Sequence, residues 1–176
     1  MLLRNIKPPP LHGNRVPPLH VVVACLANQC RSPMAELLLA RALERAGAGG
    51  RAEVSSAGLE ATPGLPATSA ARRAVQRRLG NDLLAGHRAS LLTPGLMGQA
   101  DLVLVMTRGQ KQHLLHEWGG AIDRLEGKLF TLGEYAGRPQ TDVDDPVGMP
   151  DARYDACIAL LEELTEAAAA RMAASH

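Results

Sequence analysis

The chain has 176 residues, of which 46% are hydrophobic and 21% charged, and its formal net charge is +1. That length suits one domain with a sizeable core. The near-neutral charge gives no electrostatic case for nucleic acid, and no apolar stretch approaches the ~18 residues of a membrane span. We therefore expect a globular protein with neither a nucleic-acid nor a membrane partner.

The N-terminus, residues 1–19, is rich in proline and lacks the apolar region of a signal peptide. The tetrapeptide PPLH occurs at residues 9–12 and again at 17–20, and proline at this density favours extended chain. We predict an N-terminal extension over residues 1–19 and one domain over residues 20–176. The extension is either a docking peptide for a proline-recognising partner or a plain addition.

From His20 onward, short apolar runs alternate with helical patterns. Ser32 is the expected N-cap of the first helix, with Pro33 at its first position, and Gly80 ends the second. The Ser32 hydroxyl either only caps the helix or also donates a hydrogen bond to Cys25. The predicted elements are, in chain order, a strand at 21–24, a helix at 33–46, a strand at 52–55, a helix at 66–79, a short helix from 94, a strand at 101–106, a helix at 111–118, a strand at 128–132 and a helix at 152–172. This order predicts an α/β domain with a four-stranded parallel sheet covered by helices on both faces.

Cys25 directly follows the first predicted strand, and five residues separate it from Arg31. Ligands of parallel sheets bind beyond the carboxyl ends of the strands, where this segment must curl. Its backbone N–H groups and the following helix N-terminus then form an anion-binding loop. Arg31 adds a planar fork for a tetrahedral oxyanion, and these surroundings favour a thiolate at Cys25. The segment predicts a nucleophile facing a bound phosphoryl group.

Two other interpretations of Cys25 and Cys30 are a pair of buried structural thiols and a zinc-binding pair. Cys-x4-Cys is not a usual zinc pairing, and no second Cys/His pair is spaced to complete a site. We expect neither a metal nor another cofactor, because Arg31 and the amides stabilise charge. Three cysteines do not make a disulfide framework, so a cytoplasmic location is expected. Cys30 either packs or forms a reversible disulfide with Cys25 under oxidation.

The segment CLANQCRS, residues 25–32, resembles the signature Cys-x-Gly-Asn-x-Cys-Arg-Ser of the low-molecular-weight protein tyrosine phosphatase family. The resemblance covers roughly residues 21–172 and implies a flavodoxin-like fold of the phosphotyrosine protein phosphatase I type. It implies that Cys25 attacks phosphorus to form a phosphocysteine intermediate, and that Arg31 binds the phosphoryl oxygens. The implied phosphate-binding loop comprises Leu26, Ala27, Asn28, Gln29, Cys30 and Ser32.

Cleavage of a phosphate ester or amide also needs a proton on the leaving group. The stretch TDVDDPVGMPD, residues 141–151, offers four aspartates, and spacing alone does not choose among them. The family's acid is the aspartate of an Asp-Pro pair, which implies Asp145. The resemblance further implies that Ser56 and His87 support Asn28, for which we expect a left-handed backbone conformation.

The sequence departs from the family pattern at three places. Ala27 stands where the family has glycine, which would cost ~1–2 kcal/mol if the position needs a positive φ. Gln29 replaces the aliphatic residue frequent in tyrosine phosphatases and the threonine of bacterial arginine phosphatases. Val147 and Gly148 follow Asp-Pro, where tyrosine phosphatases place aromatic residues. We expect a phosphatase for phosphotyrosine or phosphoarginine in proteins or peptides, with inorganic phosphate as product and inhibitor.

Two alternatives belong to other functional classes. A thioredoxin-coupled arsenate reductase of the same fold needs two further cysteines near the third helix, but residues 68–100 contain none and Cys157 lies in the last predicted helix. The second alternative is a catalytically weak phosphate-binding regulatory domain. Ala27 and the short loop after Pro146 favour this alternative. The joint presence of Cys25, Arg31 and Asp145 argues against it.

Overall fold

The computed structural model describes residues 17–122 and 125–174. Its elements are β1 (Leu19–Cys25), α1 (Arg31–Arg45), β2 (Ala52–Gly58), α2 (Ser69–Leu79), α3 (Pro94–Gln99), β3 (Leu102–Val105), α4 (Arg108–Trp118), α5 (Leu125–Lys128), β4 (Leu129–Thr131), α6 (Leu132–Tyr135) and α7 (Asp151–Ala174). The predicted extension over residues 1–19 lies mostly outside the described residues, so it stays a prediction.

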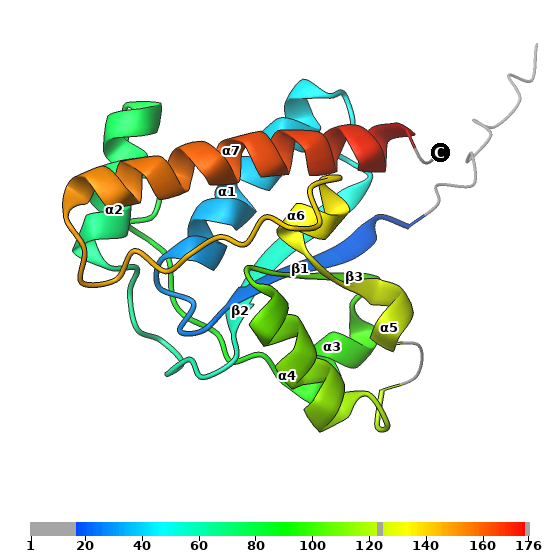
Figure 1. The fold of residues 1–176 in the computed structure, drawn as a ribbon. Coiled ribbons are helices and arrows are strands. Elements are labelled where there is room, and N and C mark those ends of the chain that lie inside the picture. Colours follow the sequence, from blue (N-terminus) through cyan, green and yellow to red (C-terminus); the bar gives the residue numbers. More distant parts are fainter. Residues whose placement is uncertain (1–16, 123–124, 175–176) are drawn as a thin grey trace, which may run out of the picture.

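The described strands form one four-stranded parallel sheet, as predicted, and their order is β2-β1-β3-β4. Side chains of β1 alternate between the two faces: Val21 and Val23 join the core with α1, α2 and α7, whereas Val22 and Ala24 join the core with α3 and α4. Figure 1 shows these two helical layers on opposite sides of the sheet. The chain leaves β1 for β2 on one side and later returns to β3 on the other, which makes the end of β1 a topological switch point.

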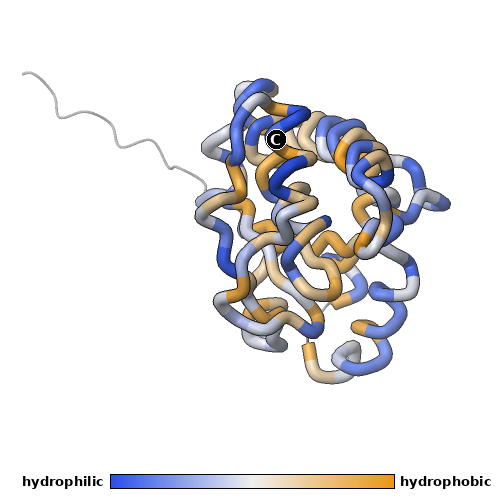
Figure 2. The backbone as a smooth tube through the Cα atoms, turned by 90° about the vertical axis from the view of Figure 1, so that its left-hand side faces the viewer, coloured by the Kyte–Doolittle hydropathy of each residue, from blue (hydrophilic) through white to orange (hydrophobic). Residues whose placement is uncertain are grey.

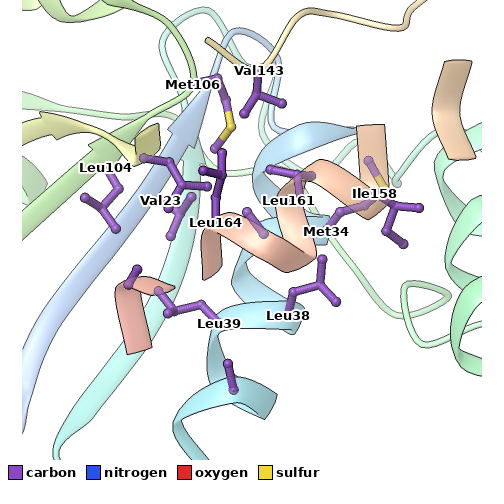
Figure 3. Close-up of a cluster of buried hydrophobic side chains, with 14 of the residues drawn as sticks. Val23, Met34, Leu38, Leu39, Leu104, Met106, Val143, Ile158, Leu161 and Leu164 are labelled. Atoms are coloured by element: carbon purple, nitrogen blue, oxygen red, sulfur yellow. The ribbon is translucent and has the colours of Figure 1, made fainter. Parts of the chain in front are cut away.

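The larger core lies between the sheet, α1 and α7 (Figure 3). Met34, Leu38 and Leu39 of α1 meet Ile158, Leu161 and Leu164 of α7 there. Val143 enters this cluster beside Met106, although it belongs to an irregular segment after β4. In Figure 2 the helical turns alternate between hydrophilic and hydrophobic colours, as expected of helices that bury one face. The core therefore holds the segment just before the predicted acid, Asp145.

The predicted cap of the first helix was wrong. The helix starts at Arg31 with Cys30 in the N-cap position, and no side chain caps it. Ser32 lies inside the helix, where its hydroxyl contacts Cys25 and Asn28 instead. Thr68 and Thr93 cap α2 and α3: their side chains accept from the amides of Ala71 and Leu96.

Two short helices, α5 and α6, were not predicted, and α4 begins earlier than expected because Thr107 and Gln110 form a capping box. A capping box of Thr131 and Glu134 also starts α6. None of the helices in the described part of the chain combines the length and apolar character that a bilayer span requires.

Candidate active site

Cys25 and Arg31 lie at the two ends of the loop that joins β1 to α1, and both side chains are buried. The Cys25 Sγ atom lies 3.1 Å from Ser32 Oγ. Asn28 Nδ2 donates a hydrogen bond to the same hydroxyl at 2.8 Å. Either the thiol or the hydroxyl can donate in the Cys25–Ser32 contact, and Ser32 Oγ also lies within hydrogen-bond distance, 3.3 Å, of the Ala57 carbonyl. The nucleophile candidate therefore lies in a polar environment at the N-terminus of α1.

Asn28 has φ 54° and is, among the described residues, the one non-glycine with a positive φ. The left-handed prediction is thus confirmed, and Ala27 does not carry the strain that its replacement of glycine raised as a possibility. Besides the Ser32 hydroxyl, three groups hold Asn28 in place. Its Nδ2 donates to Ser56 Oγ at 2.9 Å, its Oδ1 accepts from the Ser90 amide at 2.8 Å, and its carbonyl lies 2.7 Å from His87 Nε2.

Sequence reasoning missed Glu36, which extends this network. Ser56 Oγ donates to Glu36 Oε2 at 2.5 Å, so hydrogen bonds run from Glu36 through Ser56, Asn28 and Ser32 to Cys25. The available signal was helical spacing: Glu36 follows Ser32 by four residues and shares its helix face. The network links α1, β2 and the loop into one polar unit around the thiol.

Gly58, at the end of β2, packs closely against the backbone of the phosphate-binding loop. A Cβ atom there would lie 2.7 Å from both the Asn28 amide nitrogen and the Leu26 carbonyl oxygen. Only glycine permits this approach without a shift of the loop backbone. The Ser-Ala-Gly stretch thus supports the loop through Gly58 as well as through Ser56.

The remaining loop residues point in different directions. Leu26 is exposed, and Gln29 donates from Nε2 to the Pro66 carbonyl at 2.9 Å. Cys30 is buried, and burial together with the neighbouring thiols Cys157 and Cys25 raises its pKa. Burial likewise raises the pKa of Cys157 to about 12. All three cysteines are free, so the Cys25–Cys30 disulfide stays a prediction.

Of the four aspartates in residues 141–151, the structure brings Asp145 to the loop. Its Oδ2 lies 2.5 Å from Arg31 Nη2, while Arg31 Nη1 donates to the Val143 carbonyl at 3.1 Å. The other aspartates lie elsewhere: Asp144 is exposed, and Asp151 begins α7 and pairs with arginines of α2. The structure thus brings Cys25, Arg31 and Asp145 to one end of the sheet.

Asp142 pairs with Arg108 at the start of α4. A cavity of about 450 Å³ lies behind this segment, between residues 142–149 and α7. No group of three or more metal-ligating side chains arranged around one point occurs in residues 17–122 and 125–174.

The chain matches the family model described as "Low molecular weight phosphotyrosine protein phosphatase" over residues 20–176. A protein-arginine-phosphatase of Bacillus subtilis is 38% identical over 146 residues, which cover 83% of this chain and 91% of that protein. The low molecular weight protein-tyrosine-phosphatase Ptp of Acinetobacter johnsonii is 33% identical, with 81% and 90% coverage.

Among solved structures, the YwlE arginine phosphatase has a TM-score of 0.80 and 35% identity, and the match covers 90% of this chain and 98% of that chain. That structure is of a mutant in which serine replaces the active-site cysteine and carries a phosphoryl group.

Proposed function

The chain belongs to the low molecular weight phosphotyrosine protein phosphatase family, and from that premise we propose how its own residues divide the reaction between them. It is a cysteine-dependent phosphatase that hydrolyses phosphorylated protein residues through a phosphoenzyme intermediate. The names of its relatives favour this activity over arsenate reduction and over phosphate binding alone.

In the first step, the Cys25 thiolate attacks phosphorus in line with the leaving group, and a sulfur–phosphorus bond forms as the bond to oxygen or nitrogen breaks. Arg31 and the loop amides bind the three equatorial oxygens, whose charge they stabilise. Asp145 donates its proton to the departing atom. The Ser32 hydroxyl, 3.1 Å from Cys25 Sγ, stabilises the thiolate before attack.

In the second step, water attacks the phosphocysteine, and the Asp145 carboxylate takes the proton from that water. The sulfur–phosphorus bond breaks, and its electron pair returns to Cys25 as thiolate. Inorganic phosphate is released and, as a tetrahedral anion, competes with substrate for the same loop. The 2.5 Å contact between Arg31 and Asp145 is the observation that carries these assignments, because it brings the acid to the phosphate-binding loop.

Turnover of para-nitrophenyl phosphate by three proteins tests the assignments. Wild type is expected to be active, Cys25→Ser to lose activity by several orders of magnitude, and Asp145→Asn to lose about 10²- to 10⁴-fold, the typical contribution of a general acid. Mass spectrometry of Cys25→Ser after substrate incubation provides a further readout, since a trapped phosphoserine identifies the attacking position. Full activity in Cys25→Ser would remove the mechanism, and an inactive wild type would favour a binding domain.

For the substrate, we propose phosphoarginine over phosphotyrosine. Val147 and Gly148 follow the Asp-Pro pair, and no aromatic residue lies between Tyr135 and Tyr154. Val147 is 60% exposed and its amide donates to Asp145 Oδ1, so it stands beside the proposed acid without a ring to stack on a tyrosine. Stacked rings contribute beyond their buried area, so their absence removes a specific preference for phosphotyrosine.

Steady-state kinetics on matched phosphoarginine and phosphotyrosine peptides test this proposal. We expect a higher kcat/KM for the phosphoarginine peptide, and we expect Val147→Tyr to raise kcat/KM selectively for phosphotyrosine. A clear tyrosine preference of the wild type would overturn the proposal. We also propose that the enzyme works in a reducing compartment, the cytoplasm, because a thiolate nucleophile must stay reduced.

A further inference from the structure

We propose that Arg108 and Asp142 form a positioning pair that holds the acid Asp145, and through Val143 also Arg31, in place for the reaction. The inference rests on the proposed function of Asp145 and Arg31. The pair would keep these two side chains in a fixed position relative to the phosphate-binding loop.

Asp142 binds both the backbone and the side chain of Arg108. Its Oδ1 accepts from the Arg108 amide at 3.0 Å and from Nε at 3.3 Å, and its Oδ2 accepts from Nε at 3.3 Å. The Arg108 guanidinium also donates to Gln140 Oε1 at 2.7 Å. Because Arg108 is the first residue of α4, the carboxylate lies at a helix N-terminus, where negative charge is stabilised.

The start of α4 is itself well fixed. Thr107 accepts from the Gln110 amide, and the Gln110 side chain accepts from the amides of Thr107 and Met106. Met106 immediately follows β3, the strand beside β1. Asp142 is therefore tied to the central sheet rather than to another surface loop.

Asp142 is connected to both Arg31 and Asp145 through the next three positions of the chain. The Val143 amide donates to the Met106 carbonyl at 2.9 Å, and its buried side chain packs in the core with Met106 (Figure 3). Its carbonyl accepts from Arg31 Nη1 at 3.1 Å. Two residues later, Asp145 binds Arg31 Nη2. A shift at Asp142 would move the acceptor of Arg31 and the acid together.

The opposite side of the segment offers little support. A cavity of about 450 Å³ is lined by residues of 142–149 and by Arg153, Ala156, Cys157 and Leu160 of α7, whereas the Val143 side chain packs in the core with α7. Asp144 and Val147, which flank Asp145 and Pro146, are exposed. Asp145 is then held by its own contacts to Arg31 and the Val147 amide and by the anchors at Asp142 and Val143.

The test compares Arg108→Ala, Arg108→Lys and Asp142→Asn with wild type on aryl phosphates whose leaving groups differ in basicity. A misplaced acid slows the departure of a basic leaving group most. For Arg108→Ala we expect kcat/KM to fall about 10- to 100-fold on phenyl phosphate, the size of loss that a displaced group causes, but only about 3-fold or less on 2,4-dinitrophenyl phosphate. Arg108→Lys keeps the charge and should recover part of the loss.

Arg138→Ala is the matched control, because it removes an exposed arginine–carboxylate pair, with Glu163, that does not touch residues 142–145. Thermal melts of each variant are measured alongside, since an exposed ion pair contributes little to stability. In an Asp145→Asn background, Arg108→Ala should no longer change the leaving-group dependence. Equal losses on both substrates, or a loss no larger than that of Arg138→Ala, would overturn the positioning pair.

The measurements also distinguish a failure of the positioning pair from a failure of the proposed acid role of Asp145. A strong leaving-group effect in Asp145→Asn with a wild-type profile in Arg108→Ala overturns the positioning pair and leaves the acid role intact. A wild-type profile in Asp145→Asn overturns the acid role of Asp145, and the positioning pair falls with it.

Discussion

Arg31 Nη2 and Asp145 Oδ2 lie 2.5 Å apart, so the arginine proposed to bind the phosphoryl group and the acid proposed to protonate the leaving group are paired with each other. The guanidinium is almost fully buried, whereas the Asp145 side chain is 39% exposed. A phosphoryl group in the loop brings its own oxygens to the same guanidinium. We therefore expect the substrate to compete with Asp145 for Arg31, which would free the carboxyl for the leaving group.

This competition predicts that removal of the Asp145 carboxylate tightens phosphate binding. We expect Asp145→Ala to lower the Kd for inorganic phosphate several-fold, because Arg31 then binds the anion without displacing an internal partner. Isothermal titration calorimetry measures the change. Asp144→Ala is the control, since it removes the same charge from an exposed neighbour with no hydrogen bond to Arg31. An equal gain in phosphate affinity in both variants would mean that the effect comes from net charge and not from competition for Arg31.

A methyl group at Gly58 is predicted to disable the loop. The added Cβ would lie 2.7 Å from backbone atoms of Asn28 and Leu26, which cannot move without distorting the anion-binding geometry. We expect Gly58→Ala to lower kcat/KM on para-nitrophenyl phosphate about 100-fold, as small displacements at a reacting centre do. Gly50→Ala, where a Cβ meets no atom within 4 Å, should behave like wild type. An active Gly58→Ala enzyme would contradict this account.

Substitutions of Asn28 should separate backbone strain from hydrogen bonding. Asn28→Gly keeps the left-handed conformation at φ 54° but loses the side-chain bonds to Ser32, Ser56 and the Ser90 amide. Asn28→Ala loses both and should be less stable than the glycine variant by about 1 kcal/mol. Urea unfolding measures the difference. Greater stability of the alanine variant would mean that the loop relaxes out of the left-handed region.

The buried thiols predict a loss of stability at alkaline pH. Burial raises the pKa of Cys157 from its ordinary value of 9.0 to about 12, so the native state keeps the proton that the unfolded chain gives up. Stability from this group is complete below about pH 9 and declines as the pH rises toward 12. Between pH 8 and 10.5, the free energy of unfolding of Cys157→Ala should therefore fall less than that of wild type. Parallel curves for the two proteins would contradict the prediction.

The sheet could be predicted because its two central strands, β1 and β3, are largely apolar and the strands alternate with helix signals, a pattern that depends only on local sequence. Asn28 could be predicted as left-handed because few residues tolerate that conformation. For Ser32 the predicted cap was wrong, whereas the predicted contact with Cys25 is present. The helix begins at Arg31 and not at Pro33, which leaves the Ser32 hydroxyl inside it, facing Cys25 and Asn28 of the same loop.

Glu36 and the Arg108–Asp142 pair depend on contacts between positions far apart in the chain. Glu36 reaches Ser56 across 20 positions, and Arg108 reaches Asp142 across 34. No periodicity or motif in one sequence encodes such a pairing, since Glu36 and Arg108 alone each fit an ordinary solvated helix surface. Asp145 was identified only through the family resemblance, because four aspartates compete within eleven residues.

The side-chain hydrogen bonds around Asn28 all come from residues before 91, whereas the acid lies on a separate segment tethered at Asp142 and Val143. Residues 146–150 follow that tether and precede α7, whose first residue is Asp151. We expect exchange of residues 147–150 to leave the Asn28 network intact, provided that the new segment keeps the backbone amide of residue 147 that donates to Asp145 Oδ1. Grafting an aromatic segment into this stretch offers a route to retarget the enzyme toward other phosphorylated side chains.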